Sequence, residues 1–228
     1  MQASITARPA SLRYLPRMNL SSALHHRFFN VIQAEAEKLG VNVYVIGGFV
    51  RDQILGRPST DIDFVSDKLG VDLARNAAKA LGIKKIDIFK TYGTAHFRFG
   101  EWDLEFVNAR KESYTSDSRN PQVEQGSLQD DQNRRDFTIN ALAISLQKEN
   151  FGDVIDPFGG LADLEQKILR TPLDPDITYS DDPLRMMRAI RFANQLHFRI
   201  EQSSFEAIKR NADRIKIVSM ERITTELN

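Results

Sequence analysis

The sequence predicts an α+β fold in residues 21–158, followed by an all-helical region in residues 159–228. Three observations support this prediction. Up to "DPFGG", short strand-like segments are interleaved with amphipathic helical segments. Three of the strand-like segments follow one another with only turns between them, which is typical of an antiparallel sheet. After "DPFGG" the apolar spacing is helical throughout, so a sheet-containing domain precedes a helical one.

The first elements follow from periodicity and glycine placement. Residues 21–39 have helical spacing and end at a glycine. Residues 42–46 form a short apolar strand that two glycines interrupt, and "FVRDQIL" continues as a helix. Residues 61–66 alternate and predict a strand, and "GVDLARNAAKALG" predicts a helix.

The remaining elements include one long polar stretch. The segments "KIDIFK", "TAHFRFG" and "WDLEFVNA" predict three strands. Residues 111–134 are polar and contain Pro121 and Gly126, so we expect a long mobile loop, which in compact domains is usually functional or disordered. Residues 136–147 predict a short helix, or a helix that leads into a strand.

Composition sets broad limits on the function. The chain has 228 residues, of which 41% are hydrophobic and 27% charged, as in soluble globular proteins. Its 31 basic and 31 acidic residues give no overall sign of nucleic acid, although a local basic groove remains possible. Without cysteine there is neither a disulfide scaffold nor a thiolate metal site, and we expect a cytoplasmic protein. No apolar run reaches about 18 residues, so no membrane helix is expected.

The two ends of the chain carry expectations of their own. Residues 1–34 contain four arginines and no acidic residue, which fits either an organelle transit peptide or a short extension. We favour an extension over residues 1–20, because the first helical pattern begins directly after it. The segment "MERITTELN" stops inside a helical pattern without a terminator, so we expect the chain to be part of a longer protein.

A strand, a glycine pair and a helix form a possible anion-binding turn. Gly47 and Gly48 allow a ligand to approach the backbone closely, and free N–H groups at the start of a helix favour anions. Arg51 adds a positive charge one helical turn later. Most such turns are structural, and the pattern alone is weak evidence for phosphate binding.

Asp61 and Asp63 are the strongest candidates for metal ligands. Residues i and i+2 of a strand point to the same side, so both carboxylates project together. Such a pair is costly unless cations neutralise it, and Mg²⁺ takes carboxylate and phosphate oxygens together. Glu105 on a neighbouring strand could complete the cluster, with Asp103 as the competing candidate. The alternative is a solvated strand end.

Two further segments carry arginines. In "NRRDFTINALAI", Arg135 precedes Asp136, which is suited to cap a helix; the alternative reading is a capped helix with solvated arginines. In "DDPLRMMRAIRFANQL", the side chains spaced by three residues form one slanted ridge on a helix. They are Asp182, Arg185, Arg188 and Arg191. Apolar residues flank this ridge and few acids lie nearby, so we expect unpaired cations that bind an anionic or π-rich ligand.

Four segments in order resemble the class II nucleotidyltransferase family, whose members are tRNA CCA-adding enzymes and bacterial poly(A) polymerases. They are "GGFVRDQILGRPSTDIDFV", "RRDFTINALA", "DPFGGLADL" and "DDPLRMMRAIRFANQL". The resemblance spans roughly residues 20–228. It implies a polymerase-β-type head with a five-stranded mixed or antiparallel sheet, and then a helical neck that begins the RNA-binding region.

The resemblance also implies roles for individual residues. Gly47, Gly48 and Arg51 would contact the triphosphate, Asp61 and Asp63 would bind Mg²⁺, and Arg135 would contact the nucleotide. Asp182 and Arg185 would read the base edge, with Arg188 and Arg191 beside them. The polar stretch 111–134 would correspond to the flexible element of the family. Where the family usually has Glu-Asp, this chain has Asp181 and Asp182.

The expected activity is template-independent transfer of CMP and AMP from CTP and ATP to the 3′ end of tRNA by a two-metal mechanism. Alternatives of the same class are a poly(A) polymerase and an enzyme that adds only A or only CC. An alternative of another class is an inactive nucleotide- or RNA-binding module. The presence of Asp61, Asp63 and Arg51 argues against the inactive module.

Overall fold

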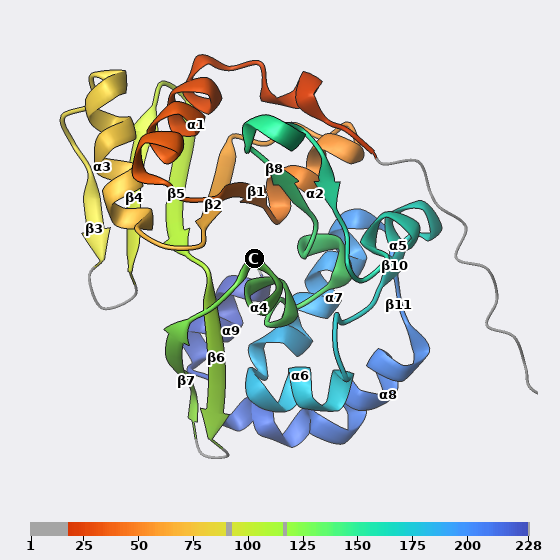
Figure 1. Ribbon diagram of the computed structural model, residues 1–228. Helices are drawn as coiled ribbons and strands as arrows, with labels where there is room; N and C mark the ends of the chain where they lie inside the picture. The colour runs from red at the N-terminus through yellow and green to blue at the C-terminus, as the bar shows by residue number, and fades with distance from the viewer. Residues whose placement is uncertain (1–17, 90–92, 116–117, 228) are drawn as a thin grey trace, which may run out of the picture.

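The computed structural model describes residues 18–89, 93–115 and 118–227, so the expectation for residues 1–17 lies outside the described part of the chain. A seven-stranded sheet dominates the first part (Figure 1). Its strands lie in the order β3 (Asp87–Phe89), β4 (Thr94–Phe99), β5 (Trp102–Asn108), β2 (Asp61–Ser66), β1 (Val43–Ile46), β8 (Ala143–Ser145) and β9 (Val154–Ile155).

The sheet is mixed, as the resemblance predicts. Strands β2 and β5 are parallel, whereas the other pairs within this sheet are antiparallel. The structure has seven strands rather than five, and its edge strands β3 and β9 are only three and two residues long. A parallel pair needs a long crossover, and the chain between β2 and β5 supplies it with α3 (Gly70–Leu81) and strands β3 and β4.

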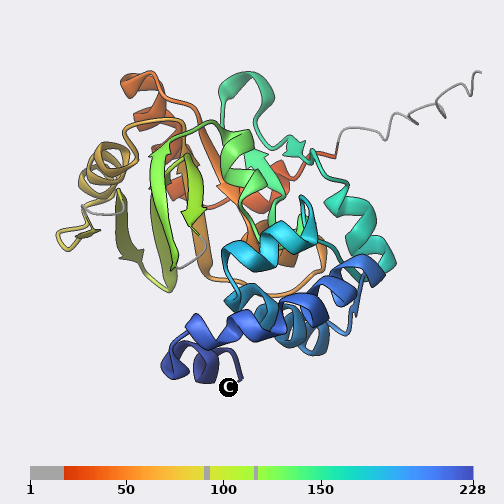
Figure 2. The same ribbon diagram turned by 90° about the horizontal axis from the view of Figure 1, so that it is seen from below.

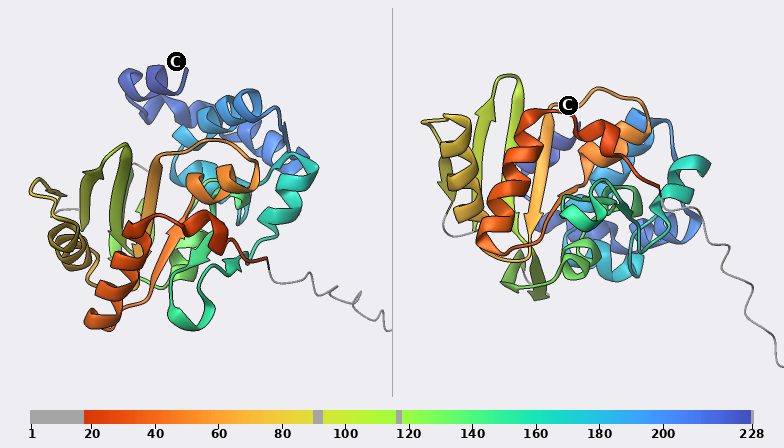
Figure 3. Two further views of the ribbon diagram at one scale, coloured as in Figure 1. Left: turned by 90° about the horizontal axis from the view of Figure 1, so that it is seen from above. Right: turned by 45° about the horizontal axis from the view of Figure 1, so that its top comes forward.

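Helices α1 (Arg27–Leu39) and α3 cover one face of the sheet (Figure 3). Ile62 and Phe64 of β2 point into this core and are each 1% exposed, together with Phe106 of β5. Because side chains alternate along a strand, the residues between them point to the opposite face. That face therefore carries the polar side chains of β2 and β5.

The first predicted helix ends where expected but begins at Arg27 rather than at residue 21. Helix α1 ends at Gly40 in the left-handed conformation (φ +62°), preceded by a 3₁₀ turn at Ser21–Leu24. Helix α2 (Gly48–Ile54) follows β1 directly. Residues 136–147 contain a 3₁₀ turn (Thr138–Asn140) and then β8, and a further 3₁₀ turn (Lys148–Asn150) leads to β9.

Residues 111–134 are not the long loop that was expected. Strands β6 (Arg110–Thr115) and β7 (Ser118–Gln125) pair as an antiparallel hairpin, and α4 (Leu128–Asn133) follows. Ser127 caps α4 and exchanges hydrogen bonds with Asp130 in a capping box. The hairpin lies beside the helical part of the chain, apart from the main sheet (Figure 1).

The C-terminal part is mainly helical, with one small parallel pair that was not predicted. Its helices are α5 (Gly160–Gln166), α6 (Pro175–Asp181), α7 (Leu184–Leu196), α8 (Gln202–Asn211) and α9 (Met220–Leu227), with a 3₁₀ turn at Ala212–Ile217. Strands β10 (Ile168–Leu169) and β11 (Arg199–Ile200) pair in parallel. Helices α7, α8 and α9 gather below the sheet region in Figure 2. Among the described residues, no helix is both long and apolar enough to span a membrane.

Candidate functional site

The open face of the sheet carries the predicted carboxylates. Asp61 and Asp63 alternate with buried Ile62, so the two acids share the face opposite the helices. In the parallel pairing of β2 with β5, Asp63 lies beside Glu105 and Asp61 beside Asp103. Four carboxylates therefore lie in two adjacent rows on this face.

The surroundings of the two candidates for a third carboxylate differ. Asp103 accepts hydrogen bonds from the His96 Nε2 and from Nε and Nη2 of Arg98, at 3.0 and 2.9 Å. Glu105 lines one cavity together with Asp63, and Asp103 does not line that cavity. Glu105 is thus positioned to act with Asp63, whereas Asp103 is occupied by partners from β4.

Burial and mutual repulsion disfavour the charged forms of Asp63 and Glu105. Burial raises the pKa of Asp63, and the nearby Arg135 only partly opposes this effect. Burial and the charge of Asp63 raise the pKa of Glu105. A cation between these carboxylates would relieve both costs.

The donor set fits Mg²⁺ only with a substrate present. No group of three or more His, Cys, Asp or Glu side chains in the described ranges is arranged to hold a metal ion by itself. Mg²⁺, however, is usually bound through one or two carboxylates together with substrate phosphates and water. The carboxylates of Asp61 and Asp63 match that donor chemistry.

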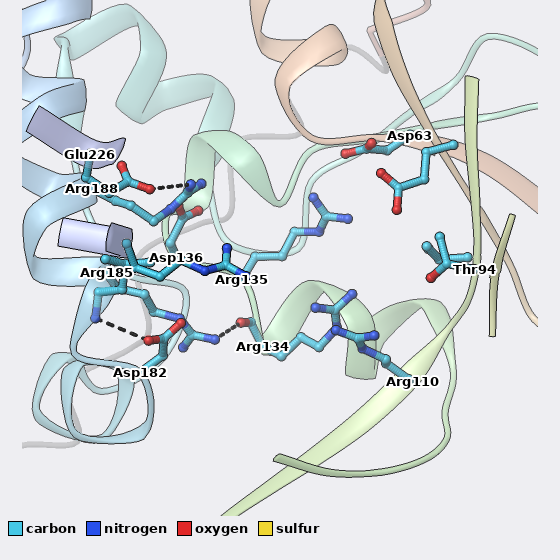
Figure 4. Close-up of a pocket in the computed structure, with 14 residues that line it drawn as sticks. Asp63, Thr94, Arg110, Arg134, Arg135, Asp136, Asp182, Arg185, Arg188 and Glu226 are labelled. Carbon is cyan, nitrogen blue, oxygen red and sulfur yellow. Dashed lines mark hydrogen bonds and ion pairs between the residues drawn. The ribbon is translucent and has the colours of Figure 1, made fainter. Parts of the chain in front are cut away.

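The cavity in front of Asp63 and Glu105 has a volume of about 420 Å³. Asp61 does not line this cavity; with Asp63, Asp103 and Glu105 it lines a smaller cavity of about 240 Å³. Figure 4 shows Asp63 on one side, Asp182 and Arg185 on the other, and Arg135 reaching between them. The lining residues of the larger cavity come from the sheet, from β6, from the segment between α4 and the 3₁₀ turn Thr138–Asn140, from the junction of α6 and α7, and from α7 and α9. They are Asp63, Thr94, Glu105, Val107, Arg110, Arg134, Arg135, Asp136, Asp182, Leu184, Arg185, Arg188, Arg222 and Glu226.

Gly47 makes room for Arg135 beside Asp63. A Cβ atom on Gly47 would lie 2.7 Å from Nη1 of Arg135 and 3.4 Å from Oδ2 of Asp63. The backbone of Gly47 also has φ +86° and ψ −135°, a conformation that side chains strongly disfavour. In this structure the glycine thus permits a close approach by a guanidinium of the protein itself.

Arg51 does not line the cavity. It is 8% exposed and donates to both carboxylate oxygens of Asp52, at 3.0 and 2.8 Å, and to Oδ1 of Asn140 at 2.7 Å. Its guanidinium also lies 5.1 Å from the centre of the Phe192 ring. The structure therefore places Arg51 behind the glycine turn, where it links α2 to Asn140.

Asp136 does not cap a helix, in contrast to the sequence-based expectation. The next 3₁₀ turn has Phe137 at its N-cap, without a side-chain cap. Asp136 is instead buried, accepting from Asn140 Nδ2 at 3.0 Å and from Arg188 Nε at 2.7 Å. Burial alone would raise the pKa of Asp136, but the charge of Arg188 and the hydrogen bond from Asn140 lower it overall.

The arginines of α7 are paired, which corrects the prediction of unpaired cations. Arg188 binds Asp136 and lies 3.6 Å from Glu226, and Arg191 donates to Glu226 at 2.7 Å. Arg185 donates to the backbone carbonyls of Arg134 at 2.6 Å and Thr178 at 3.4 Å. The acidic partners Asp136 and Glu226 lie 52 and 35 residues away from Arg188 and Arg191, so local counting of acids could not find them.

The ridge is also split between two surfaces. Asp182, Arg185 and Arg188 line the cavity with the carboxylates. Arg191 lies on a separate cavity between α7 and α9, beside Met187 and Ile190. Asp182 itself lies between α6 and α7, where its Oδ1 accepts from the backbone N–H of Leu184 at 3.2 Å.

Several lining residues were not predicted as site residues. Thr94 and Arg110 come from strands β4 and β6, and Arg222 and Glu226 come from the last helix. Arg222 and Glu226 are four residues apart, so helical periodicity could have placed them on one face. Nothing in the sequence indicates that this face meets α7.

Comparisons with known proteins give a consistent picture. Residues 43–170 match the family described as "Poly A polymerase head domain", and residues 197–228 match "Probable RNA and SrmB- binding site of polymerase A". The A-adding tRNA nucleotidyltransferase of Aquifex aeolicus is 43% identical over 169 residues, which are 74% of this chain and 20% of that protein. The CCA-adding enzyme of Lactobacillus helveticus is 38% identical over 192 residues, which are 83% of this chain and 46% of that protein.

Solved structures agree in fold at substantial sequence identity. The Thermotoga maritima CCA-adding enzyme complexed with tRNA has a TM-score of 0.78 at 31% identity, over 92% of this chain and 49% of that chain. A tRNA nucleotidyltransferase complexed with a primer tRNA and an incoming ATP analog has a TM-score of 0.75 at 36% identity, over 86% of this chain and 54% of that chain. The chain thus spans about half the length of these structures, and less of the Aquifex protein.

Proposed function

The chain belongs to the family of the poly(A) polymerase head domain, the class II nucleotidyltransferases, and on that premise we propose that it transfers CMP and AMP from CTP and ATP to the 3′ end of tRNA. The relatives whose names state these activities are about twice as long or longer, so substrate and product are part of the proposal. So is the cytoplasmic location expected from the cysteine-free composition.

The observation that most directly supports the proposal is the cavity between the sheet and α7. Its sheet side carries Asp63 and Glu105, and arginines project from the other sides. A triphosphate needs positive charge around its oxygens, and a reacting α-phosphate needs its bound cations held beside it. The cavity offers both within one space of about 420 Å³.

Asp61 and Asp63 would hold Mg²⁺, which when bound neutralises phosphate charge and activates the attacking 3′-hydroxyl. Glu105 lies beside Asp63 and would complete the negative side of the cavity. Arg134 and Arg135 face the same space and would bind the phosphates electrostatically. The 3′-hydroxyl of the RNA attacks the α-phosphorus, the bond to the β-phosphate breaks, and pyrophosphate leaves.

Asp182 and Arg185 would select the base. A carboxylate accepts from the exocyclic amine of cytosine or adenine, and a guanidinium donates to ring acceptors. Arg185 uses one N–H on each of two backbone carbonyls, and a guanidinium has five N–H groups, so donors remain for a base. Guanine and uracil lack an amine where cytosine and adenine present one.

The test is product sizing with a tRNA that lacks its CCA end, each nucleoside triphosphate being supplied separately and then together. CCA addition predicts two residues with CTP alone and three with CTP plus ATP. Incorporation of ATP only after a supplied CC end would instead identify an A-adding enzyme, a candidate favoured by the 43% identical relative. Long adenylate tails would identify a poly(A) polymerase, and nucleotide binding without any extension would identify an inactive module.

A further inference from the structure

Two buried carboxylates lie behind the arginines of the nucleotide cavity. Asp131 of α4 is 0% exposed, and the side chain of Glu112 on β6 is 3% exposed. Neither is among the residues that line the cavity. Both lie in the polar stretch that the sequence predicts as a mobile loop, and both are bonded to arginines that do line the cavity.

Asp131 holds two consecutive arginines with its two oxygens. Its Oδ1 accepts from Nε of Arg134 at 2.9 Å and also from Nη2 of the same residue. Its Oδ2 accepts from Nε and Nη2 of Arg135, each at 3.2 Å. The spacing of three and four residues brings these side chains together just beyond the end of α4.

Glu112 extends the arrangement to a third arginine. Its Oε1 lies 2.7 Å from Nη2 of Arg110 and 3.4 Å from Nη1 of Arg134. The charges therefore alternate from Arg110 through Glu112, Arg134 and Asp131 to Arg135. The hairpin and α4 together supply the negative members of this row, and the cavity receives the positive ones.

A long arginine side chain has many rotamers, and a buried carboxylate is costly unless it is bonded. The bond between the guanidinium and the buried carboxylate offsets both the lost side-chain entropy and the cost of burial. It therefore fixes the guanidinium before any ligand binds. Nε and Nη2 of Arg135 donate to Asp131, and Nη1 donates to the carbonyl oxygen of Asn140 at 3.4 Å. The guanidinium is thereby held at the position that Gly47 leaves open beside Asp63.

We propose that Asp131 is a positioning residue for nucleotide transfer: it holds Arg134 and Arg135 in the orientation that receives the triphosphate, and Glu112 extends this support to Arg110. The role of these arginines toward phosphate rests on the proposed function. The attachment of the arginines to Asp131 is independent of it and is measured separately below.

The sign of the effect separates positioning from a simple field effect. Asp131→Asn keeps the size of the side chain but removes a negative charge near the cavity. If only the field mattered, the variant would bind a triphosphate more tightly, because less negative charge would oppose it. If Asp131 orients the arginines, the variant binds more weakly, because the guanidinium groups must be ordered again on binding.

The experiment compares Asp131→Asn with Asp163→Asn. Asp163 is also buried and bonded to an arginine, accepting from Thr138 at 2.7 Å and Arg170 at 3.3 Å, but it does not line or support the cavity. Affinities for CTP, ATP and inorganic triphosphate are measured by calorimetry with Mg²⁺ and without RNA. In parallel, NMR records the arginine Nε–H signals, which are slowly exchanging only when the guanidinium is held.

Asp131→Asn is expected to weaken binding of all three ligands by about tenfold or more, as loss of an orienting partner does at metal ligands. It is also expected to release the signals of Arg134 and Arg135, while Asp163→Asn changes neither readout. Unchanged or tighter binding, or unchanged arginine signals, overturns the positioning role. If those signals are released but the wild-type protein binds no nucleotide, the positioning stands and the proposed function fails.

A second variant covers the case in which Asp131→Asn does not fold. Glu112→Gln leaves the bonds of Asp131 to Arg134 and Arg135 in place and removes the charge that lies 2.7 Å from Arg110 and 3.4 Å from Arg134. The expected result is release of the Arg110 signal and a smaller loss of triphosphate affinity. If the signal of Arg110 and the affinity both remain as in the wild type, the extension of the support to the hairpin is wrong.

Discussion

A methyl group on Gly47 would occupy the space that Arg135 now fills. Gly47→Ala is expected to lower the melting temperature, because its backbone conformation costs about 1–3 kcal/mol for other residues. It is also expected to weaken CTP and ATP binding, since the new Cβ would lie 2.7 Å from Nη1 of Arg135. Calorimetry and thermal unfolding of the same sample measure both effects.

Gly40→Ala is the matched control. Gly40 also has a positive φ, +62°, but no atom lies within 4 Å of its would-be Cβ. The Gly40→Ala variant should therefore lower stability and leave nucleotide affinity unchanged. Equal losses of affinity in both variants would mean that Gly47 matters only for backbone strain.

Asp63→Asn tests the metal-binding side of the cavity. The variant is expected to lose nucleotide transfer by at least about 100-fold, more than is usual for residues that merely support a metal ligand. Its melting temperature should not fall, because burial already disfavours the charged form and raises the pKa of Asp63. Primer extension and thermal unfolding are the two measurements.

Asp103→Asn is the comparison for that variant. Asp103 lies in the next row of the same face and is bonded to His96 and Arg98. Nucleotide transfer should persist in Asp103→Asn. The loss of the exposed ion pair between Asp103 and Arg98 should lower stability only slightly. Retained transfer in Asp63→Asn would refute the assignment of Asp63 as a metal ligand.

At the scale of single residues, local geometry was predictable from the sequence, whereas long-range side-chain pairing was not. The strand period alone puts Asp61 and Asp63 on one face, whatever the rest of the chain does. The place of Arg51 depends on Asn140, which is 89 residues away, and that of Arg191 depends on Glu226. A sequence pattern contains no information on such contacts unless the tertiary packing is known.

At the scale of elements, Asp136 ties the segment between α4 and β8 to α7 through Arg188. The pKa of Asp136 is lowered in the folded protein, although burial opposes this, because Arg188 and Asn140 favour the carboxylate. Its stabilising effect is thus complete above the unfolded pKa of about 3.9 and is lost as the pH falls toward the folded value.

Asp136→Asn is accordingly expected to destabilise the protein by about 1–3 kcal/mol at pH 7. The difference from the wild type should shrink as the pH falls from about 4 toward the lowered pKa of folded Asp136, because the unfolded state binds the proton first. Denaturant unfolding of both proteins at pH 7 and pH 3 measures this difference in the free energy of unfolding. A difference that stays constant over this range would contradict a role for the charge of Asp136.

The hairpin β6–β7 shows why one element was missed. Its residues are almost all polar, so the sequence shows no alternation of apolar and polar residues from which strands could be predicted. Its position is fixed partly by ion pairs such as that of Glu112 with Arg134. The amphipathic helices α1 and α3, whose apolar faces cover the sheet, were predicted from their periodicity, α3 with nearly correct bounds and α1 with a correct C-terminal end.

At the scale of the whole molecule, charge distribution predicts the relative affinities for nucleotide and RNA. The chain has no net charge, and RNA binding depends mainly on phosphate contacts that weaken steeply with salt. Residues 1–228 are therefore expected to bind Mg²⁺–CTP measurably, and to bind tRNA weakly at about 0.15 M salt. Titration of both ligands against the same sample measures this.

The control for this titration is one of the longer relatives, measured under identical conditions. The RNA-binding match covers only residues 197–228, so the relative should bind tRNA more tightly and the nucleotide about equally. Equal tRNA affinity of the two proteins would locate the main RNA contacts within these 228 residues. It would also contradict the expected division between a nucleotide-binding head and a separate RNA-binding region.

The parallel pairing of β2 with β5 sets an order of events during folding. Strands β4 and β5 are joined by a turn at residues 100–101, whereas β2 ends at Ser66 and β5 begins only at Trp102. Closing the longer loop costs more entropy, so the β4–β5 hairpin should form first. Pulsed hydrogen exchange during refolding should protect the hairpin amides before those between β2 and β5. Asp63 and Glu105 would then be brought side by side only after the β4–β5 hairpin has formed, when β2 pairs with β5.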